Sequence, residues 1–294
     1  MTMQPILVKA ALSVLGLSLA LFASPRALAQ EAICLQSQMQ NIQSKPTATA
    51  PSASDTDAKL DPREEADYKV FFKLKPEDLD RRMQVGDAFV NKYPDGPFTE
   101  PVYSQLTTAA YQKQDFARME TYADHALALN PDDVTVLVFV GWVIPHSASP
   151  APAQLDKAEK FERHALELLP TLPKPAGMSD AQLATAKSEY ELQAHSGLGL
   201  VDYRRQDFQS AAAELNQATV DASRPDPADL YVLGVSLGRL DRFSDAASAF
   251  SRCAAIPGAE QASCKQRADA AKKLASANTA TASVTQPGQP PLPR

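Results

Sequence analysis

Two of the three cysteines in this sequence, Cys253 and Cys264, are placed so that they can form a disulfide. Pro257-Gly258 lies between them, and a turn there folds the following segment back beside the preceding helix. We expect a bridge that adds on the order of 2–3 kcal/mol of stability for so short a loop; two buried thiols are the alternative. Redox catalysis is not expected, because the pair lacks C-x-x-C spacing and a nearby activating base. Cys34 is left over, either free or linked to another chain.

The histidines do not form a recognisable metal or catalytic motif. The sequence has four, which are His125, His146, His164 and His195. His125 and His164 occupy equivalent places near the ends of two predicted helices, where we expect them to face solvent. The sequence has no H-x-x-x-H pair, no Cys/His cluster, no G-x-S-x-G and no glycine-rich phosphate loop. We therefore predict no metal, no cofactor and no enzymatic activity.

Charged side chains alternate in sign along the segment 152–168. Asp156, Glu162 and Glu167 lie among Lys157, Lys160 and Arg163. This pattern is typical of a solvated helix face, with oppositely charged neighbours supporting one another. We expect Glu162 and its neighbours to be exposed.

The elements that would position these residues are clearest in the segment 227–258. Apolar or small residues recur there at helical spacing in two runs, first Leu230, Leu233, Gly234, Leu237 and Leu240, then Phe243, Ala246, Ala247, Phe250 and Ala254. Asp241-Arg242 separates the runs, and Pro257-Gly258 ends the second. The pattern predicts two antiparallel helices that approach closely at Gly234 and Ala246.

The same hairpin pattern recurs along the chain. After Leu233-Gly234, an aromatic residue follows the Gly at nine, Ala at twelve and Phe at sixteen residues, and Leu198-Gly199 is followed by Phe208, Ala211 and Leu215 at those offsets. The anchors of four copies are Leu106, Val140, Leu198 and Leu233, spaced 34, 58 and 35 residues apart. In the copy led by Val140-Gly141, five extra residues within 145–150 lengthen the predicted inter-helix loop. A linker near 171–178 accounts for the rest of the long spacing.

This period and pattern resemble the tetratricopeptide repeat (TPR) family. The most familiar segments are Tyr111–Phe116 and Ala126–Pro131, and the resemblance covers roughly residues 62–257. It implies an all-α fold, a right-handed superhelical solenoid of antiparallel helix hairpins with a C-terminal capping helix. The expected repeats span about 62–94, 100–131, 134–170, 180–221 and 227–257, and the cap spans 259–275. Thr107 and Met119 depart from the usual small residues of the family.

The resemblance also implies a binding surface, because first helices line the concave side of such arrays. By position, the groove residues are Ser104, Thr108, Tyr111, Trp142, Tyr203, Arg204, Tyr231, Val235 and Arg239. Aromatic and Arg side chains dominate binding energy at interfaces. For Trp142 and its neighbour Phe139, a place in the core is the alternative.

The two ends of the chain indicate export and flexible flanks. Met1–Ala29 has Lys9, an apolar run and Ala27-Leu28-Ala29, typical of a signal peptide cleaved after Ala29; an uncleaved anchor is the alternative. Residues 30–60 are expected to be a disordered linker, and the Pro-rich segment 276–294 a disordered tail.

These observations predict a non-catalytic protein–protein interaction scaffold of the bacterial cell envelope, periplasmic or secreted, that binds a protein or peptide segment in its groove. A self-associating structural subunit is the alternative. The net charge is −6 and no basic patch occurs, so nucleic acid is not an expected partner. No integral membrane span is expected once the leader is removed.

Overall fold

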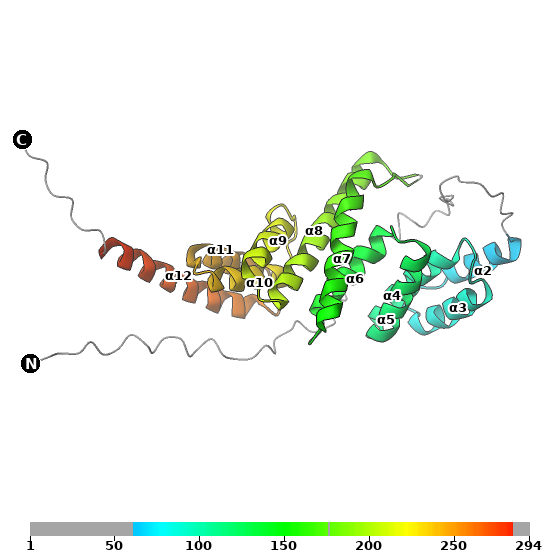
Figure 1. Ribbon diagram of the computed structural model, residues 1–294, viewed down its shortest axis with the longest axis horizontal. Helices are drawn as coiled ribbons and strands as arrows, with labels where there is room; N and C mark the ends of the chain where they lie inside the picture. Colours follow the sequence, from blue (N-terminus) through cyan, green and yellow to red (C-terminus); the bar gives the residue numbers. More distant parts are fainter. Residues whose placement is uncertain (1–60, 176, 285–294) are drawn as a thin grey trace, which may run out of the picture.

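The computed structural model describes residues 61–175 and 177–284, and every regular element in that part of the chain is a helix. The helices are α2 (Pro62–Phe72), α3 (Leu79–Lys92), α4 (Thr99–Gln112), α5 (Phe116–Leu129), α6 (Val134–His146), α7 (Pro152–Leu168), the 3-10 turn η1 (Leu169–Thr171), α8 (Asp180–Arg204), α9 (Phe208–Val220), α10 (Pro227–Arg239), α11 (Phe243–Ala254) and α12 (Gln261–Val284). They follow one another along the long axis of the molecule, from α2 at one end to α12 at the other (Figure 1). The predicted all-α class is confirmed.

Several predictions concern residues outside this description. The signal peptide at 1–29, the linker at 30–60, the role of Cys34 and the tail beyond 284 all lie outside the described residues. They stay predictions.

Acidic and hydroxyl side chains begin most of the helices. The Asp115 carboxylate accepts a hydrogen bond from Arg118 N at 3.1 Å, and the Asp207 carboxylate accepts one from Ser210 N at the same distance. Ser179 and Gln182 form a reciprocal capping box at the start of α8. Each cap satisfies a backbone N–H that has no partner within its own helix, which fixes where that helix begins.

Three of the helix pairs are joined by the same tight turn. Gln114, Gln206 and Asp241 have φ of 60°, 65° and 58°, and each lies two residues before the Phe that begins the second helix. In each case the backbone N–H of the residue after the left-handed one donates to a carbonyl in the last turn of the first helix. Asp115 N, for example, donates to Ala110 O at 2.9 Å. This is a Schellman ending, which usually has Gly at the left-handed position. The turn brings the second helix back beside the first.

Small residues let the paired helices approach. A methyl group at Gly234 would lie 2.7 Å from Phe250 Cε1, and one at Gly199 would lie 2.5 Å from Leu215 Cγ. Ala246 is also buried. The predicted close approach in the pair α10–α11 is therefore present, and the same contact recurs in α8–α9.

Side chains one hairpin apart contact one another at a regular spacing in the chain. Eight hydrogen bonds join residues 32 to 35 positions apart, within the helices or at their ends. They are Glu64 with Phe98 N, Asp80 with Lys113, Asp87 with Tyr122, Glu120 with Gln154, Asp124 with Lys157, Asp132 with His164, Ser196 with Asp229, and the Thr219 carbonyl with Arg252. Several link one second helix to the next, as from α3 to α5 and from α5 to α7. Successive hairpins therefore meet in a repeated way.

The last helix is longer than expected. The sequence predicts a cap at 259–275 and a disordered tail from 276, but α12 continues to Val284. Residues 275–284 contain four alanines and no proline, and alanine has the highest intrinsic helix propensity. The Pro-rich composition that predicts disorder begins only at Pro287.

Candidate partner-binding surface

The predicted groove residues all lie on the first helices of successive pairs. Ser104, Thr108 and Tyr111 are on α4, Trp142 is on α6, Tyr203 and Arg204 are on α8, and Tyr231, Val235 and Arg239 are on α10. The structure divides them into a buried group and a partly exposed group.

Thr108 and Trp142 belong to the buried group, and their predicted place on a surface groove is wrong for this structure. Thr108 is 5% exposed and Trp142 is 8% exposed, as is expected of core side chains. Phe139, one turn before Trp142, is also buried. The next hairpin covers this face of α6, an arrangement that spacing within α6 alone does not reveal.

Two tyrosines occupy equivalent positions at the ends of α4 and α8. Tyr111 packs edge-on against Phe116 with ring centroids 6.1 Å apart, and Tyr203 packs in the same way against Phe208 at 6.0 Å. Tyr111 also meets Phe139 edge-on at 5.2 Å, and partial burial raises the pKa of its hydroxyl. Both rings remain partly exposed. An aromatic neighbour thus holds each ring in position.

The equivalent position on α10 is Gly238, and no heavy atom lies within 4 Å of where its Cβ would be. The surface is therefore open at this point. Next to it, the exposed Arg239 places its guanidinium over the ring of Phe208 at 5.0 Å. Cation–π contact of this kind orients the side chain without removing it from solvent.

Arg204 is tied to the preceding pair. Its Nε donates to Pro145 O at 2.9 Å and its guanidinium also donates to Ser147 O at 2.8 Å. Partial burial lowers its pKa, which still leaves it charged at neutral pH. Arg204 thus closes the C-terminal end of α6, and replacing it would alter the joint between two hairpins as well as the surface.

The remaining predicted residues are also partly covered. Tyr231 packs edge-on against Phe250 at 5.8 Å and lies under the Arg267 guanidinium at 5.0 Å. Val235 packs against the core of the last hairpins, and Ser104 is half-buried. The accessible part of the predicted groove therefore consists mainly of Tyr111, Tyr203 and Arg239.

A chain of buried hydrogen bonds runs beneath this surface through three hairpins. Trp142 Nε1 donates to Ser196 Oγ at 3.2 Å, and Ser196 Oγ donates to Asp229 Oδ1 at 2.9 Å. Burial, followed by repulsion from Asp226, raises the pKa of Asp229 well above its usual range. Because the chain joins α6, α8 and α10, it fixes their relative rotation.

Glu162 is the most unexpected residue of the structure, since the sequence predicts it on a solvated helix face. Its side chain is fully buried, and neither carboxyl oxygen has a hydrogen-bond partner. It fills the space between Gly141 of α6 and Gly197 of α8, where a methyl group on Gly141 would lie 2.6 Å from its Cδ. Burial raises its pKa well above the usual value, because the interior disfavours the charged form of the carboxyl.

The sequence does contain a signal for this burial. Phe250 and Leu215 follow their glycines by sixteen residues, and Glu162 follows Gly141 by sixteen plus the five-residue insertion. Glu162 therefore holds the core position that Phe and Leu hold elsewhere. The charged residues around it in the chain concealed this equivalence.

The histidines lie in separate environments. His125 is exposed and stacks on Tyr103 at 4.9 Å, and the half-buried His164 places Nε2 2.8 Å from Asp132 Oδ1. His195 Nδ1 lies 2.6 Å from Glu214. His146 Nδ1 donates to Trp142 O at 2.7 Å, and burial lowers its pKa to about 4.

Within residues 61–175 and 177–284, no group of three or more His, Cys, Asp or Glu side chains is arranged to hold a metal ion. In the same part of the chain, no helix combines the length and the apolar character needed to cross a membrane.

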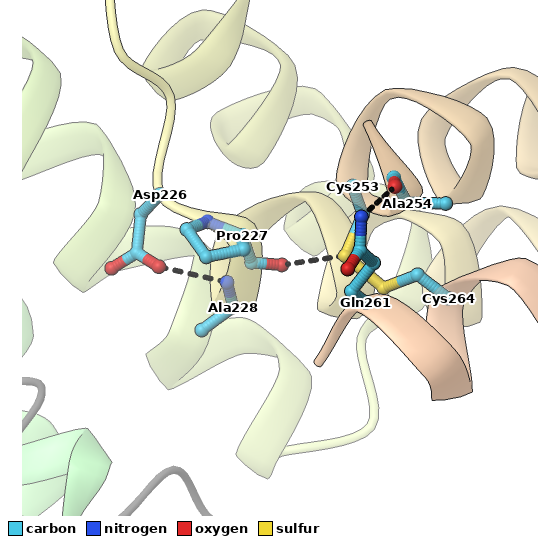
Figure 2. Close-up of a disulfide and its surroundings, with 7 residues drawn as sticks. All are labelled: Asp226, Pro227, Ala228, Cys253, Ala254, Gln261 and Cys264. Atoms are coloured by element: carbon cyan, nitrogen blue, oxygen red, sulfur yellow. Dashed lines mark hydrogen bonds between the residues drawn. A yellow bond between two sulfur atoms is a disulfide. The ribbon is translucent and has the colours of Figure 1, made fainter. Parts of the chain in front are cut away.

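The structure pairs Cys253 with Cys264, as the sequence predicts. The two Cα atoms are 5.8 Å apart and the bridge joins α11 to α12. Figure 2 shows Gln261 beside it, donating from Nε2 to Ala254 O at 3.1 Å, and the Cys253 sulfur 3.3 Å from Pro227 O. Both cysteines are fully buried.

Comparison with known proteins adds no family to these observations: no family model matches the sequence, and no curated protein is significantly similar to it.

Proposed function

We propose that this protein is a TPR-like α-solenoid that acts as a non-catalytic protein-interaction scaffold in the bacterial cell envelope. A partner segment would lie across the first helices α4, α8 and α10, in contact with Tyr111, Tyr203 and Arg239. The disulfide between Cys253 and Cys264 supports export, because such bridges persist in oxidising compartments.

The observation that carries the proposal is the repetition of contacts between hairpins. Eight hydrogen bonds join residues 32 to 35 positions apart, and the left-handed turn residue recurs in three pairs. Repeated contacts of one kind between neighbours build a stacked array whose surface is continuous from one repeat to the next.

The exposed side chains on that surface are held before any partner arrives. Phe116 and Phe208 fix the rings of Tyr111 and Tyr203, and Phe208 also fixes Arg239. Preorganised aromatic and Arg side chains lose little conformational entropy on binding. A partner segment would therefore bear most of the ordering cost.

Gly238 offers a direct test of this surface. A tyrosine introduced there meets no neighbouring atom within 4 Å at its Cβ, so Gly238→Tyr should fold normally while it obstructs the surface. The matched control is Arg118→Ala on the exposed face of α5, a second helix. Circular dichroism and melting curves would verify that both variants fold like the parent.

The full chain, these two variants and a third variant, Arg239→Ala, would be used to capture proteins from cell-envelope extract, followed by quantitative mass spectrometry. We expect a partner retained by the parent and by Arg118→Ala, with about tenfold less captured by Gly238→Tyr or Arg239→Ala. Equal capture by all four chains would refute binding at this surface. Affinity for the purified partner would then be compared across the same set.

A further inference from the structure

The helix α12 is docked through very small side chains. Its buried side chains are Cys264, Ala268 and Ala271, which pack against α11 and the start of α10. An alanine buries a single methyl group, so Ala268 and Ala271 each contribute little apolar burial. Lys265, Asp269 and Lys272 on the opposite face are exposed.

Polar contacts from α12 to α10 and α11 add little to its attachment. Gln261 donates to Ala254 O at 3.1 Å, and Arg267 lies over the Tyr231 ring at 5.0 Å. Both contacts are at partly exposed positions. The disulfide from Cys253 to Cys264 is therefore the strongest single tie between α12 and the body of the molecule.

The face under α12 is more apolar than α12 itself. Leu230, Phe250 and Ala247 are buried there, with Tyr231 partly covered at its edge. If α12 lifted away, these side chains would form an exposed apolar patch at the end of the array. Patches of this kind promote association.

We propose that the α10–α11 face is an exchangeable helix-docking interface, closed by its own α12 in the monomer and able to accept the α12 of a second copy of this chain. The bridge controls the exchange. When it is formed within one chain, α12 cannot leave; when it is open, the same two cysteines can pair between chains.

Opening and closing follow thiol–disulfide exchange with an external dithiol. One thiolate of the dithiol attacks Cys264 Sγ, and the Cys253 sulfur leaves as a thiolate that takes up a proton. The second thiol of the dithiol then displaces Cys264, so that the protein gains two electrons and two protons while the reductant becomes a cyclic disulfide. A disulfide oxidant reverses the process. Because both cysteines are fully buried, attack requires a local opening around the bridge while α12 is still attached.

Reduction would leave Cys253 well placed for a new partner. Its sulfur lies 3.3 Å from Pro227 O, so the reduced thiol has an acceptor on α10 and stays at the docking face. Cys264 leaves with α12. The docking face of one chain thus keeps the thiol that the incoming helix of another chain requires.

A second copy is the occupant favoured by the structure because α12 already fits this face. Residues 255–260 connect α11 to α12 and contain Pro257-Gly258, which can act as the hinge. α12 packs mainly on α11 and α10, so its exchange leaves the contacts among α2 to α9 unchanged. Exchange of a terminal element between identical chains is a low-cost route to a dimer.

The hinge also sets the conditions for exchange. A short connection gives the chain's own α12 an effective concentration in the millimolar range, so the closed monomer is favoured in dilute solution. Exchange should therefore be observed after reduction, on reoxidation at high protein concentration.

The first experiment uses the full chain carrying Cys34→Ser, so that only the two bridge cysteines remain. The protein is reduced, then reoxidised with glutathione disulfide at about 10 μM and at about 1 mM, on either side of the hinge's effective concentration. We expect the covalent dimer on a non-reducing gel to increase at least about tenfold at the higher concentration. Monomer alone at both concentrations would overturn the proposal.

A second experiment removes the possibility of closure within one chain. In the Cys34→Ser background, a chain with Cys253→Ser is mixed with a chain with Cys264→Ser and oxidised. Only α12 of the first chain docked on the second can form the native bridge, so a heterodimer should exceed either homodimer about tenfold.

The matched control moves the thiol to the outer face of α12. In the first chain, Cys264→Ser and Lys265→Cys replace the buried thiol by an exposed one. If the chain with Lys265→Cys gives as much heterodimer as the chain with Cys264, the cross-link results from random collision and the proposal fails. Circular dichroism of each variant shows whether its helices are intact.

Discussion

Replacing Glu162 by glutamine should remove much of the pH dependence of stability around α6, α7 and α8. The parent carboxyl is fully buried, has no hydrogen-bond partner and lies between Gly141 and Gly197. Glutamine has nearly the same shape and no charge at any pH. The substitution therefore separates the effect of ionisation on the free energy of unfolding from the effect of burying a polar side chain.

The sign of the effect follows from the raised pKa of Glu162 in the folded protein. The folded state keeps a proton that the unfolded state releases above its ordinary pKa of about 4.3. Unfolding therefore releases a proton, and the free energy of unfolding falls as pH rises from that value up to the folded pKa. The slope is about 1.4 kcal/mol per pH unit for one proton.

As pH rises above about 5.5, the parent should lose stability relative to Glu162→Gln by about 1.4 kcal/mol per pH unit, until the raised pKa of the folded carboxyl is reached. Asp229, Glu100 and His146 also have shifted pKa values, but they are present in both chains and cancel in the difference. Below about pH 3.5 the carboxyl of the parent is protonated in both the folded and the unfolded state, so the difference in stability between the two proteins should stop changing with pH.

Trp142 is the only tryptophan and is adjacent to Gly141, so its fluorescence reports unfolding at this joint. Urea titrations at three pH values, followed by Trp142 emission, give the difference directly, even if the array does not unfold in one step. Glu162→Leu serves as a second variant, because Leu215 occupies the equivalent position. A pH-independent difference between parent and Glu162→Gln would mean that Glu162 is solvated or paired, and our reasoning would be wrong.

Three other predictions test the packing. Gln206→Gly should raise the free energy of unfolding by about 0.5–1 kcal/mol, since Gln206 has a φ of 65° and this left-handed conformation is unfavourable for any residue with a Cβ. Urea titration of the parent and the variant measures the difference, and a loss of stability would contradict the prediction. Gly234→Leu should lower the free energy of unfolding by about 1–3 kcal/mol or more, because even a methyl group there would lie 2.7 Å from Phe250. An unchanged melting curve would show that α10 and α11 do not pack in this register. The His146 ring should stay neutral from about pH 8 to about pH 5, because burial lowers its pKa to about 4; NMR shifts of its ring protons should not move over that range.

The sequence predicts those features that local chemistry determines. Asp115 and Asp207 mark helix starts, Gly199 and Gly234 mark close helix contacts, and the turn at Pro257-Gly258 brings the two cysteines together. Each signal lies within one hairpin. The helix pairs consequently lie close to where the sequence predicts them.

Features that depend on the next hairpin were harder to predict. The family resemblance places Trp142 in the groove, with a place in the core as the alternative, and the structure has it in the core, where its ring nitrogen donates to Ser196 of α8. Glu162 has charged neighbours in sequence, but its place in the repeat makes it a core residue. The left-handed turns at Gln114 and Gln206 could not be predicted from a glycine, because neither position has one.

The unusual residues gather at one joint of the array, and this has a consequence for its dynamics. Where Leu215 and Phe250 fill the equivalent core position in α9 and α11, α7 has the unpartnered Glu162. A buried polar group without a partner costs about 1–3 kcal/mol relative to an apolar one. We therefore expect the joint of α7 with α6 and α8 to be less stable than the equivalent joints that Leu215 and Phe250 fill.

That cost grows with pH because Glu162 must keep its proton to stay buried, so α7 should be the first element to open in alkaline solution. Hydrogen exchange, corrected for the intrinsic effect of pH on amide exchange, should show protection of α7 falling as pH rises, with protection of α11 falling less. Glu162→Gln should remove the difference. Equal losses of protection in α7 and α11 of the parent would show that the array opens as a whole, and the buried carboxyl would then have no local effect on its dynamics.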